Sequence, residues 1–175
     1  MWRLLIIAAI IQFANSDGEC KLPVNLGKQN CGKPPQTLYF FDVDTYMCLA
    51  FNYSGCGGNH NSFNTSEECE MWCSVGDERY HACDNDTPKV GFCSRSKKCP
   101  KGSSCKMIGS EGVCCLNEDD KRLVADENPN CGNKKVVKER IGRYKRTLFG
   151  KSCSHNFCPK NSECRRGNFF SYCCK

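Results

Sequence analysis

The chain has 175 residues, eighteen cysteines and a formal net charge of +6, and 39% of its residues are hydrophobic. Cysteine at about a tenth of a short chain is typical of a secreted disulfide scaffold, and this composition excludes a single large core because small domains bury too little surface without disulfides. Oxidised cysteines exclude a thiol-based metal site or a cofactor held by thiols, and the modest charge of a secreted chain excludes nucleic acid as a partner.

The N-terminal segment predicts secretion. Arg3 supplies one positive charge, residues 4–13 form an apolar run broken only by Gln12, and small residues follow at positions 14–16. This is the pattern of a secretory signal peptide over residues 1–16, cut after Ser16 or within two residues of it. The alternative is a membrane anchor, but the run is well short of the ~20 apolar residues that a spanning helix needs. We therefore expect a secreted, extracellular protein with no membrane partner.

The cysteines divide into three groups of six, which predict three domains at residues 20–73, 83–115 and 131–174. Cysteine-free segments separate the groups, and the second segment begins with the acidic run at residues 117–120. An even number of cysteines in each group lets every thiol pair within its own domain. The first group consists of Cys20, Cys31, Cys48, Cys56, Cys69 and Cys73.

The first group predicts a hairpin followed by a helix. Residues 37–42 are aromatic and favour a strand, residues 42–45 suit a turn, and residues 47–53 form a second strand. Thr65-Ser-Glu-Glu68 is a capping box, in which the Thr65 hydroxyl accepts from the backbone of Glu68 and the Glu68 carboxylate reaches back. Cys69 and Cys73 are four residues apart and lie on one helical face, positioned to clamp the helix to the hairpin and to the N-terminal segment.

These residues resemble a Kunitz domain, the pancreatic trypsin inhibitor fold. The resemblance rests on Leu38-Tyr-Phe-Phe-Asp42, on Phe51-x-Tyr53-x-Gly55-Cys56-x-Gly58-Asn59-x-Asn61-x-Phe63, on Glu68-Cys69-x-x-x-Cys73, and on the last three cysteine spacings of seven, twelve and three residues. It implies a small disulfide-rich α+β fold, a twisted β-hairpin with a C-terminal helix. It also implies the pairs Cys20–Cys73, Cys31–Cys56 and Cys48–Cys69, and a buried, structural Asn61.

The resemblance implies a serine protease as partner, yet the predicted reactive loop departs from the family pattern. A Kunitz inhibitor presents a rigid, substrate-like loop, and the residue after the second cysteine enters the primary pocket of the protease. Here that residue is Gly32, which has no side chain to insert, and Lys33 follows it. In the facing loop, Ser54 replaces the first glycine of the usual Gly-Gly pair, so a side chain stands where close backbone approach is expected.

The cysteine spacing in this loop departs as well. Ten residues separate Cys20 from Cys31, where the family usually has eight, and sixteen separate Cys31 from Cys48, where it has fifteen. We expect an aberrant reactive loop of Gly32, Lys33 and Ser54 that inhibits weakly. The first alternative is a working inhibitor of unusual specificity, with Lys33 shifted into the pocket position. The distant alternative is a toxin-like ligand of ion channels.

Three sequons predict N-glycosylation. The first is Asn52-Tyr-Ser54, on the strand that leads into the facing loop, where a glycan would shield the inhibitory surface. The second is Asn64-Thr-Ser66, at the start of the helix. The third is Asn85-Asp-Thr87, which is weakened by Pro88.

The second and third groups repeat one another. Cys99-Pro-Lys-Gly-Ser-Ser-Cys105 matches Cys158-Pro-Lys-Asn-Ser-Glu-Cys164, and eight residues then lead to a Cys-Cys pair in both. Adjacent cysteines rarely bond to each other, so each pair is expected to tie two different segments to one point; the connectivity stays open. The pattern resembles the lustrin-type cysteine-rich repeat, and the whole resembles nematode secreted Kunitz proteins of the blistered-cuticle type. The resemblance implies a role in extracellular matrix, cuticle formation or moulting.

A basic run precedes the second cysteine of the third group. It has seven basic residues and one acid, and its three interpretations are a contact with anionic matrix or glycan, a proprotein-convertase site ending at Arg146, and a solvated hairpin or loop. The basic residues are Lys134, Lys135, Lys138, Arg140, Arg143, Lys145 and Arg146.

Enzyme chemistry has no support in the sequence. The three histidines are scattered among cysteines that should all be oxidised, so they form no nucleophile–base pair with a thiol. They are His60, His81 and His155. We therefore expect a binding or structural protein and not an enzyme.

Overall fold

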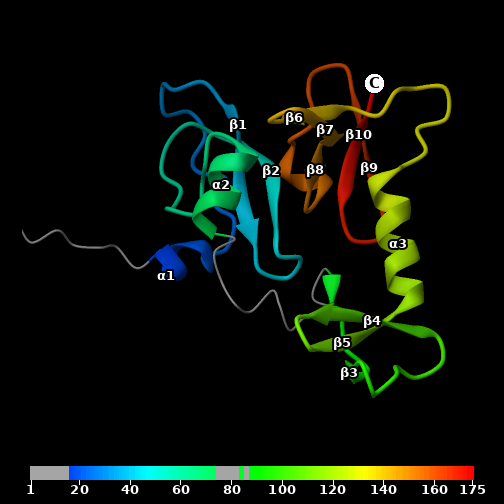
Figure 1. The fold of residues 1–175 in the computed structure, drawn as a ribbon. Helices are drawn as coiled ribbons and strands as arrows, with labels where there is room; N and C mark the ends of the chain where they lie inside the picture. The colour runs from blue at the N-terminus through cyan, green and yellow to red at the C-terminus, as the bar shows by residue number, and fades with distance from the viewer. Residues whose placement is uncertain (1–15, 74–82, 85–86) are drawn as a thin grey trace, which may run out of the picture.

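The computed structural model describes residues 16–73, 83–84 and 87–175 (Figure 1). The predicted signal peptide lies almost wholly outside these residues; the described chain begins with the short helix α1 (Ser16–Cys20). Within the described residues, no helix combines the length and the apolar character needed to cross a membrane.

The first cysteine group forms the hairpin and helix that its sequence predicts. Strand β1 (Gln36–Asp42) pairs antiparallel with β2 (Met47–Tyr53), so the first strand begins one residue earlier than predicted. Leu38 lies opposite Phe51, and Phe40 lies opposite Leu49. Since cross-strand partners share a face of the sheet, these four apolar side chains form one buried face. Helix α2 (Ser66–Cys73) packs against the other side of the hairpin.

The two repeats share an architecture. The repeat at residues 83–115, called repeat 1 here, has the strands β3 (Gly91–Ser94), β4 (Ser103–Ile108) and β5 (Glu111–Leu116) in the order β3-β5-β4. The repeat at residues 131–174, called repeat 2, has β8 (Phe149–Gly150), β9 (Glu163–Arg166) and β10 (Ser171–Cys174) in the order β8-β10-β9, with a short 3-10 turn η3 (Cys153–His155). Repeat 2 carries an additional hairpin, β6 (Lys138–Ile141) with β7 (Tyr144–Thr147).

All eighteen cysteines lie in nine disulfides, and the two repeats use the same connectivity. In each repeat the first cysteine pairs with the sixth, the second with the fourth and the third with the fifth. The adjacent cysteines bond to different segments in both repeats, as their geometry requires. The pairs are Cys83–Cys115, Cys93–Cys105 and Cys99–Cys114 in repeat 1, and Cys131–Cys174, Cys153–Cys164 and Cys158–Cys173 in repeat 2.

Repeat 2 shares buried clusters with the Kunitz hairpin. Phe149 and Phe170 of this repeat pack into one buried cluster with the apolar face of the β1–β2 hairpin, and β8 lies beside β2 (Figure 1). A second shared cluster joins Ala50 of β2 to Leu148, Phe157 and Cys173. The hairpin is therefore covered on both faces, by α2 and by repeat 2. The pattern of apolar residues in the hairpin could not predict that repeat 2 covers one face, because the same pattern fits a hairpin that is partly exposed to solvent.

The acidic segment between the repeats is a helix, α3 (Asn117–Glu127), which connects repeat 1 to repeat 2 (Figure 1). Near its end, Asp126 is 2% exposed and caps the turn before β10. Its carboxylate accepts hydrogen bonds from the backbone N–H groups of Asn168 at 2.7 Å, Phe169 at 2.7 Å and Phe170 at 3.1 Å. The segment, which the sequence analysis described by its acidic run and its lack of cysteines, is thus a fixed connection to repeat 2.

Candidate functional site

The predicted reactive loop is braced at its base by the facing segment. Cys31 is bonded to Cys56, the backbone N–H of Lys28 donates to the Cys56 carbonyl at 2.7 Å, and the N–H of Ser54 donates to the Leu26 carbonyl at 2.8 Å. The longer approach to Cys31 therefore runs antiparallel to residues 54–56. In Figure 1 this blue segment turns at the edge of the molecule far from α3 and β9.

Gly32 lies at the exposed tip of this loop in a left-handed conformation. Its φ is +80°, and a Cβ built on it would meet no described atom within 4 Å. Asn30, on the other side of Cys31, also has a positive φ, of +60°. An extended, substrate-like strand needs a negative φ at each residue. The backbone around Cys31 is therefore bent at two places.

Lys33 and Gly55 make the close approach between the two loops. A Cβ at Gly55 would lie 2.7 Å from the Lys33 carbonyl oxygen, and Gly55 has a φ of +110°. Only glycine fits this position, because both the space and the backbone conformation exclude a side chain. Ser54 is half-buried and lies one residue before the point of contact. Lys33 itself is exposed, so its side chain is free to meet a partner.

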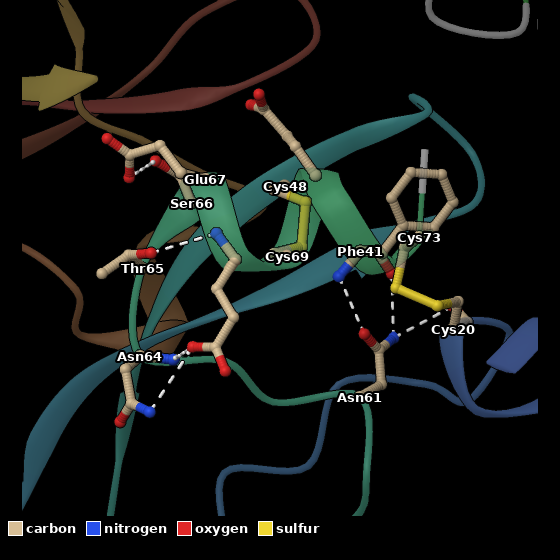
Figure 2. Close-up of a disulfide and its surroundings, with 12 residues drawn as sticks. Cys20, Phe41, Cys48, Asn61, Asn64, Thr65, Ser66, Glu67, Cys69 and Cys73 are labelled. Carbon is tan, nitrogen blue, oxygen red and sulfur yellow. Dashed lines mark hydrogen bonds between the residues drawn. A yellow bond between two sulfur atoms is a disulfide. The ribbon is translucent and has the colours of Figure 1, made fainter. Parts of the chain in front are cut away.

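A buried asparagine holds the scaffold beneath the loop. Asn61 is 0% exposed; its Oδ1 accepts from the Phe41 N–H at 2.8 Å, and its Nδ2 donates to the carbonyls of Leu22 at 2.7 Å and Phe41 at 2.9 Å. Figure 2 shows this side chain beside the Cys20–Cys73 disulfide, with Cys48–Cys69 on the adjoining side of the helix. Three cystines and one amide therefore fix the N-terminal segment, the hairpin and α2 together.

The start of α2 follows the predicted capping box with one shift. The N–H of Glu68 donates to the Thr65 hydroxyl at 3.0 Å. The Glu68 carboxylate reaches back one residue further than expected and accepts from the Asn64 N–H at 2.9 Å (Figure 2). The helix start is therefore satisfied on both sides by local side chains.

The predicted sequons lie in different environments. Asn64 is exposed, but Ser66 of the same sequon is 2% exposed, at the first residue of α2. Asn52 is half-buried on β2, opposite Thr37. Asn85 lies outside the described residues, as does His81. The glycosylation of all three asparagines stays a prediction.

The basic run forms the β6–β7 hairpin, and two of its seven cations are used within the fold. Arg146 donates to Glu70 of α2 and to Glu139, both at 2.7 Å. Lys134 pairs with Glu163 at 2.7 Å. These two cations therefore already have carboxylate partners within the fold. The matrix or glycan contact expected of the basic run stays a prediction. Glu67 of α2 also accepts a hydrogen bond from the N–H of Gly142 at 3.0 Å. The pKa of Glu67 is lowered, first by a bond from its own backbone N–H and second by this bond from Gly142.

A further cluster of charges joins repeat 2 to the turn of the first hairpin, and no pattern in the sequence predicts it. Lys151 donates to Asp42 at 2.5 Å and also to Asp44. Burial acts to lower the pKa of Lys151, but the bonds to these two carboxylates outweigh it and raise the pKa. His155 lies beside this pair, where burial and then the Lys151 charge lower its pKa. They line a cavity of about 410 Å³ between the two units.

One group of three sulfur atoms among the described residues has the spacing of a metal site. The sulfur atoms of Cys93, Cys99 and Cys114 lie close enough to share an ion, but each is in a disulfide and has no thiolate to offer. The arrangement offers two binding surfaces: an exposed loop on a disulfide-braced hairpin, and a basic hairpin that is bonded to α2.

These features define a class of protein: a three-disulfide hairpin-and-helix domain with an exposed loop pinned by its second and fourth cysteines. The family model for the Kunitz/bovine pancreatic trypsin inhibitor domain matches residues 19–74. Major allergen Ani s 1 of Anisakis simplex is 35% identical over 183 residues, covering 98% of this chain and 94% of that protein. The BPTI/Kunitz inhibitor domain-containing protein C02F12.5 of Caenorhabditis elegans is 30% identical over 175 residues, covering 99% and 96%.

The chain therefore belongs to the Kunitz family of serine protease inhibitors, and its relatives in two nematodes extend over both repeats as well. Over 42% of this chain, it is also 34% identical to the Kunitz-type serine protease inhibitor LmKTT-1a of Lychas mucronatus, of which 88% is covered.

Proposed function

We propose that this protein is a secreted, non-enzymatic Kunitz protein whose altered loop makes it a weak inhibitor or modulator of serine proteases. It would act in extracellular matrix, in cuticle formation or moulting. Family membership supports the protease as partner, and nine disulfides support an extracellular location. The observation that carries the weak inhibition is Gly32, which has no side chain and a φ of +80°.

Inhibition requires both an anchor and a preorganised strand. A trypsin-like pocket is specific because an acid at its base meets a basic side chain, and Gly32 brings none. Rigidity supports affinity only when the fixed conformation is the bound one. A loop that is rigid but bent at Asn30 and Gly32 has to deform before it fits the cleft, so its rigidity opposes binding.

The exposed side chain of Lys33 favours a second candidate, an inhibitor of unusual specificity. Lys33 follows Gly32 directly, and its backbone packs on Gly55. If an enzyme accepted the loop one residue out of register, Lys33 would fill a trypsin-like pocket. The variant Lys33→Ala separates the two candidates, since only the second depends on this side chain.

The test is a titration of the secreted chain, with both repeats present, against trypsin, chymotrypsin and elastase. The repeats are needed because β1 and β2 share their core with repeat 2. We expect inhibition constants in the micromolar range or weaker for all three enzymes. Nanomolar inhibition of any one enzyme would contradict the proposal. If the variant Lys33→Ala then lost that inhibition, the second candidate would be established.

A further inference from the structure

The β6–β7 hairpin has two chemically different faces. Arg140 lies opposite Lys145, and Glu139 lies opposite Arg146. Because side chains alternate along a strand and cross-strand partners share a face, Lys138, Arg140 and Lys145 lie together on one face. We call this the outer face. Glu139 and Arg146 lie on the inner face.

The inner face is fixed to the Kunitz helix. Arg146 bonds to Glu70, and the N–H of Gly142 at the hairpin turn donates to Glu67 at 3.0 Å. Both acids belong to α2. These bonds orient the hairpin, so the outer face is held on the side away from the helix.

The outer face and its flanks carry five exposed cations. Within the described residues, none of the five has an acidic partner within 4.0 Å. They are Lys135, Lys138, Arg140, Arg143 and Lys145. Like charges directly opposite each other on a hairpin destabilise it, and Arg140 with Lys145 is such a pair. Folding therefore gains nothing from this arrangement, whereas an anionic ligand would relieve the repulsion.

We propose that the outer face binds a linear polyanion of the extracellular space, a sulfated or carboxylated polysaccharide. Residues two apart on one strand are about 6.6 Å apart, so this face presents Lys138 and Arg140 along β6, with Lys145 across from Arg140, as a compact cluster of positive charge to an extended chain. A lipid surface fits less well, because membrane-binding faces also need apolar side chains to insert. The exposed Tyr144 pairs with Ile141 and so belongs to the opposite face.

Heparin is the probe, and the protein is the full secreted chain. The test variant is Lys138→Gln with Arg140→Gln and Lys145→Gln. The matched control is Arg95→Gln with Lys97→Gln and Lys98→Gln, three exposed cations in the β3–β4 loop of repeat 1 that remove the same charge. Both variants are checked for an unchanged unfolding midpoint. The protease titration is run in parallel, so that failure of this proposal can be distinguished from failure of the proposed inhibition at the loop of Gly32.

We expect the outer-face variant to lose at least about tenfold in heparin affinity at 0.15 M salt, with the control near wild type. The slope of log K against log salt should fall by roughly two to three, since each cation that neutralises an anionic group releases about one counterion. Equal losses in both variants, unchanged binding in the outer-face variant, or equally tight binding to phosphatidylserine vesicles would overturn the proposal. If the outer-face variant changed protease inhibition and left heparin affinity unchanged, that result would also contradict the proposal.

Discussion

Arg146 Nη1 lies 2.7 Å from Glu70 Oε1, which joins a strand of repeat 2 to the helix of the Kunitz domain. The same guanidinium holds Glu139, whose side chain is only 10% exposed. A processing enzyme that cleaves after Arg146 would need this residue to be accessible. Instead it is half-buried in β7, followed by the buried Thr147.

We predict that Arg146→Gln lowers the free energy of unfolding by about 1–3 kcal/mol, because it leaves a mostly buried carboxylate unpaired. The measurement is denaturant unfolding with the disulfides intact. Lys145→Gln, the exposed neighbour, is the control and should stay within about 0.5 kcal/mol of wild type. Equal stability of the two variants would contradict the docking role of Arg146.

We predict that Phe149→Ala destabilises the protein by about 3–5 kcal/mol, the usual range for removing a buried aromatic ring. Phe149 is 5% exposed, and its ring centroid is 4.8 Å from that of Phe170. The specific readout is amide hydrogen exchange at Leu49 and Phe51, which share this core. Protection there should fall. If β2 kept full protection, the Kunitz hairpin would be stable without repeat 2.

The matched control for this substitution is Phe92→Ala in repeat 1. Phe92 is 58% exposed and lies beneath Lys89, at 4.8 Å from ring centroid to Nζ. Its loss should cost below about 1 kcal/mol, since exposed cation–π pairs are worth about that much.

We predict that Asp126→Asn costs at least about 2 kcal/mol. An amide removes the charge from an acceptor of three backbone N–H groups, and bonds to charged groups contribute about 1.5–3 kcal/mol each. Thermal unfolding measures the loss. Glu127→Gln, its exposed neighbour, should be neutral; a similar small effect for both would show that the turn before β10 does not depend on the buried carboxylate.

We predict that His155 makes stability fall as the pH drops through about 6.5. Its pKa in the folded protein is lowered, by burial and then by Lys151, although Asp42 opposes this. Between the folded and unfolded pKa values the unfolded chain binds more protons, so unfolding becomes easier as the pH falls. Unfolding midpoints between pH 7.5 and 5.5 measure the slope. His155→Gln should flatten it, and an unchanged slope would assign it to other groups.

The Kunitz hairpin and helix could be predicted to within a residue because their signals are local: alternating strands, a turn and a capping box. The contacts of repeat 2 could not be predicted, because Phe149, Lys151 and Asp126 meet partners more than forty residues away. At the loop, Gly32 could be identified by counting from Cys31, but its positive φ could not. A glycine is compatible with either sign of φ, and only the surrounding chain decides. The acidic first turn of α3 is a local helical signal, because acidic side chains favour the N-terminal end of a helix.

In the proposed function, the backbone at Gly32 is the main obstacle to inhibition, in addition to the missing side chain. The direct measurement is the trypsin inhibition constant of Gly32→Arg beside wild type, with Gly32→Ala reporting the strain alone. A side chain in the left-handed region costs about 1–2 kcal/mol, and 1.4 kcal/mol is tenfold in affinity. We predict that Gly32→Arg gains less than about tenfold over wild type. Nanomolar trypsin inhibition by Gly32→Arg would contradict the account, because the loop would then need only its side chain.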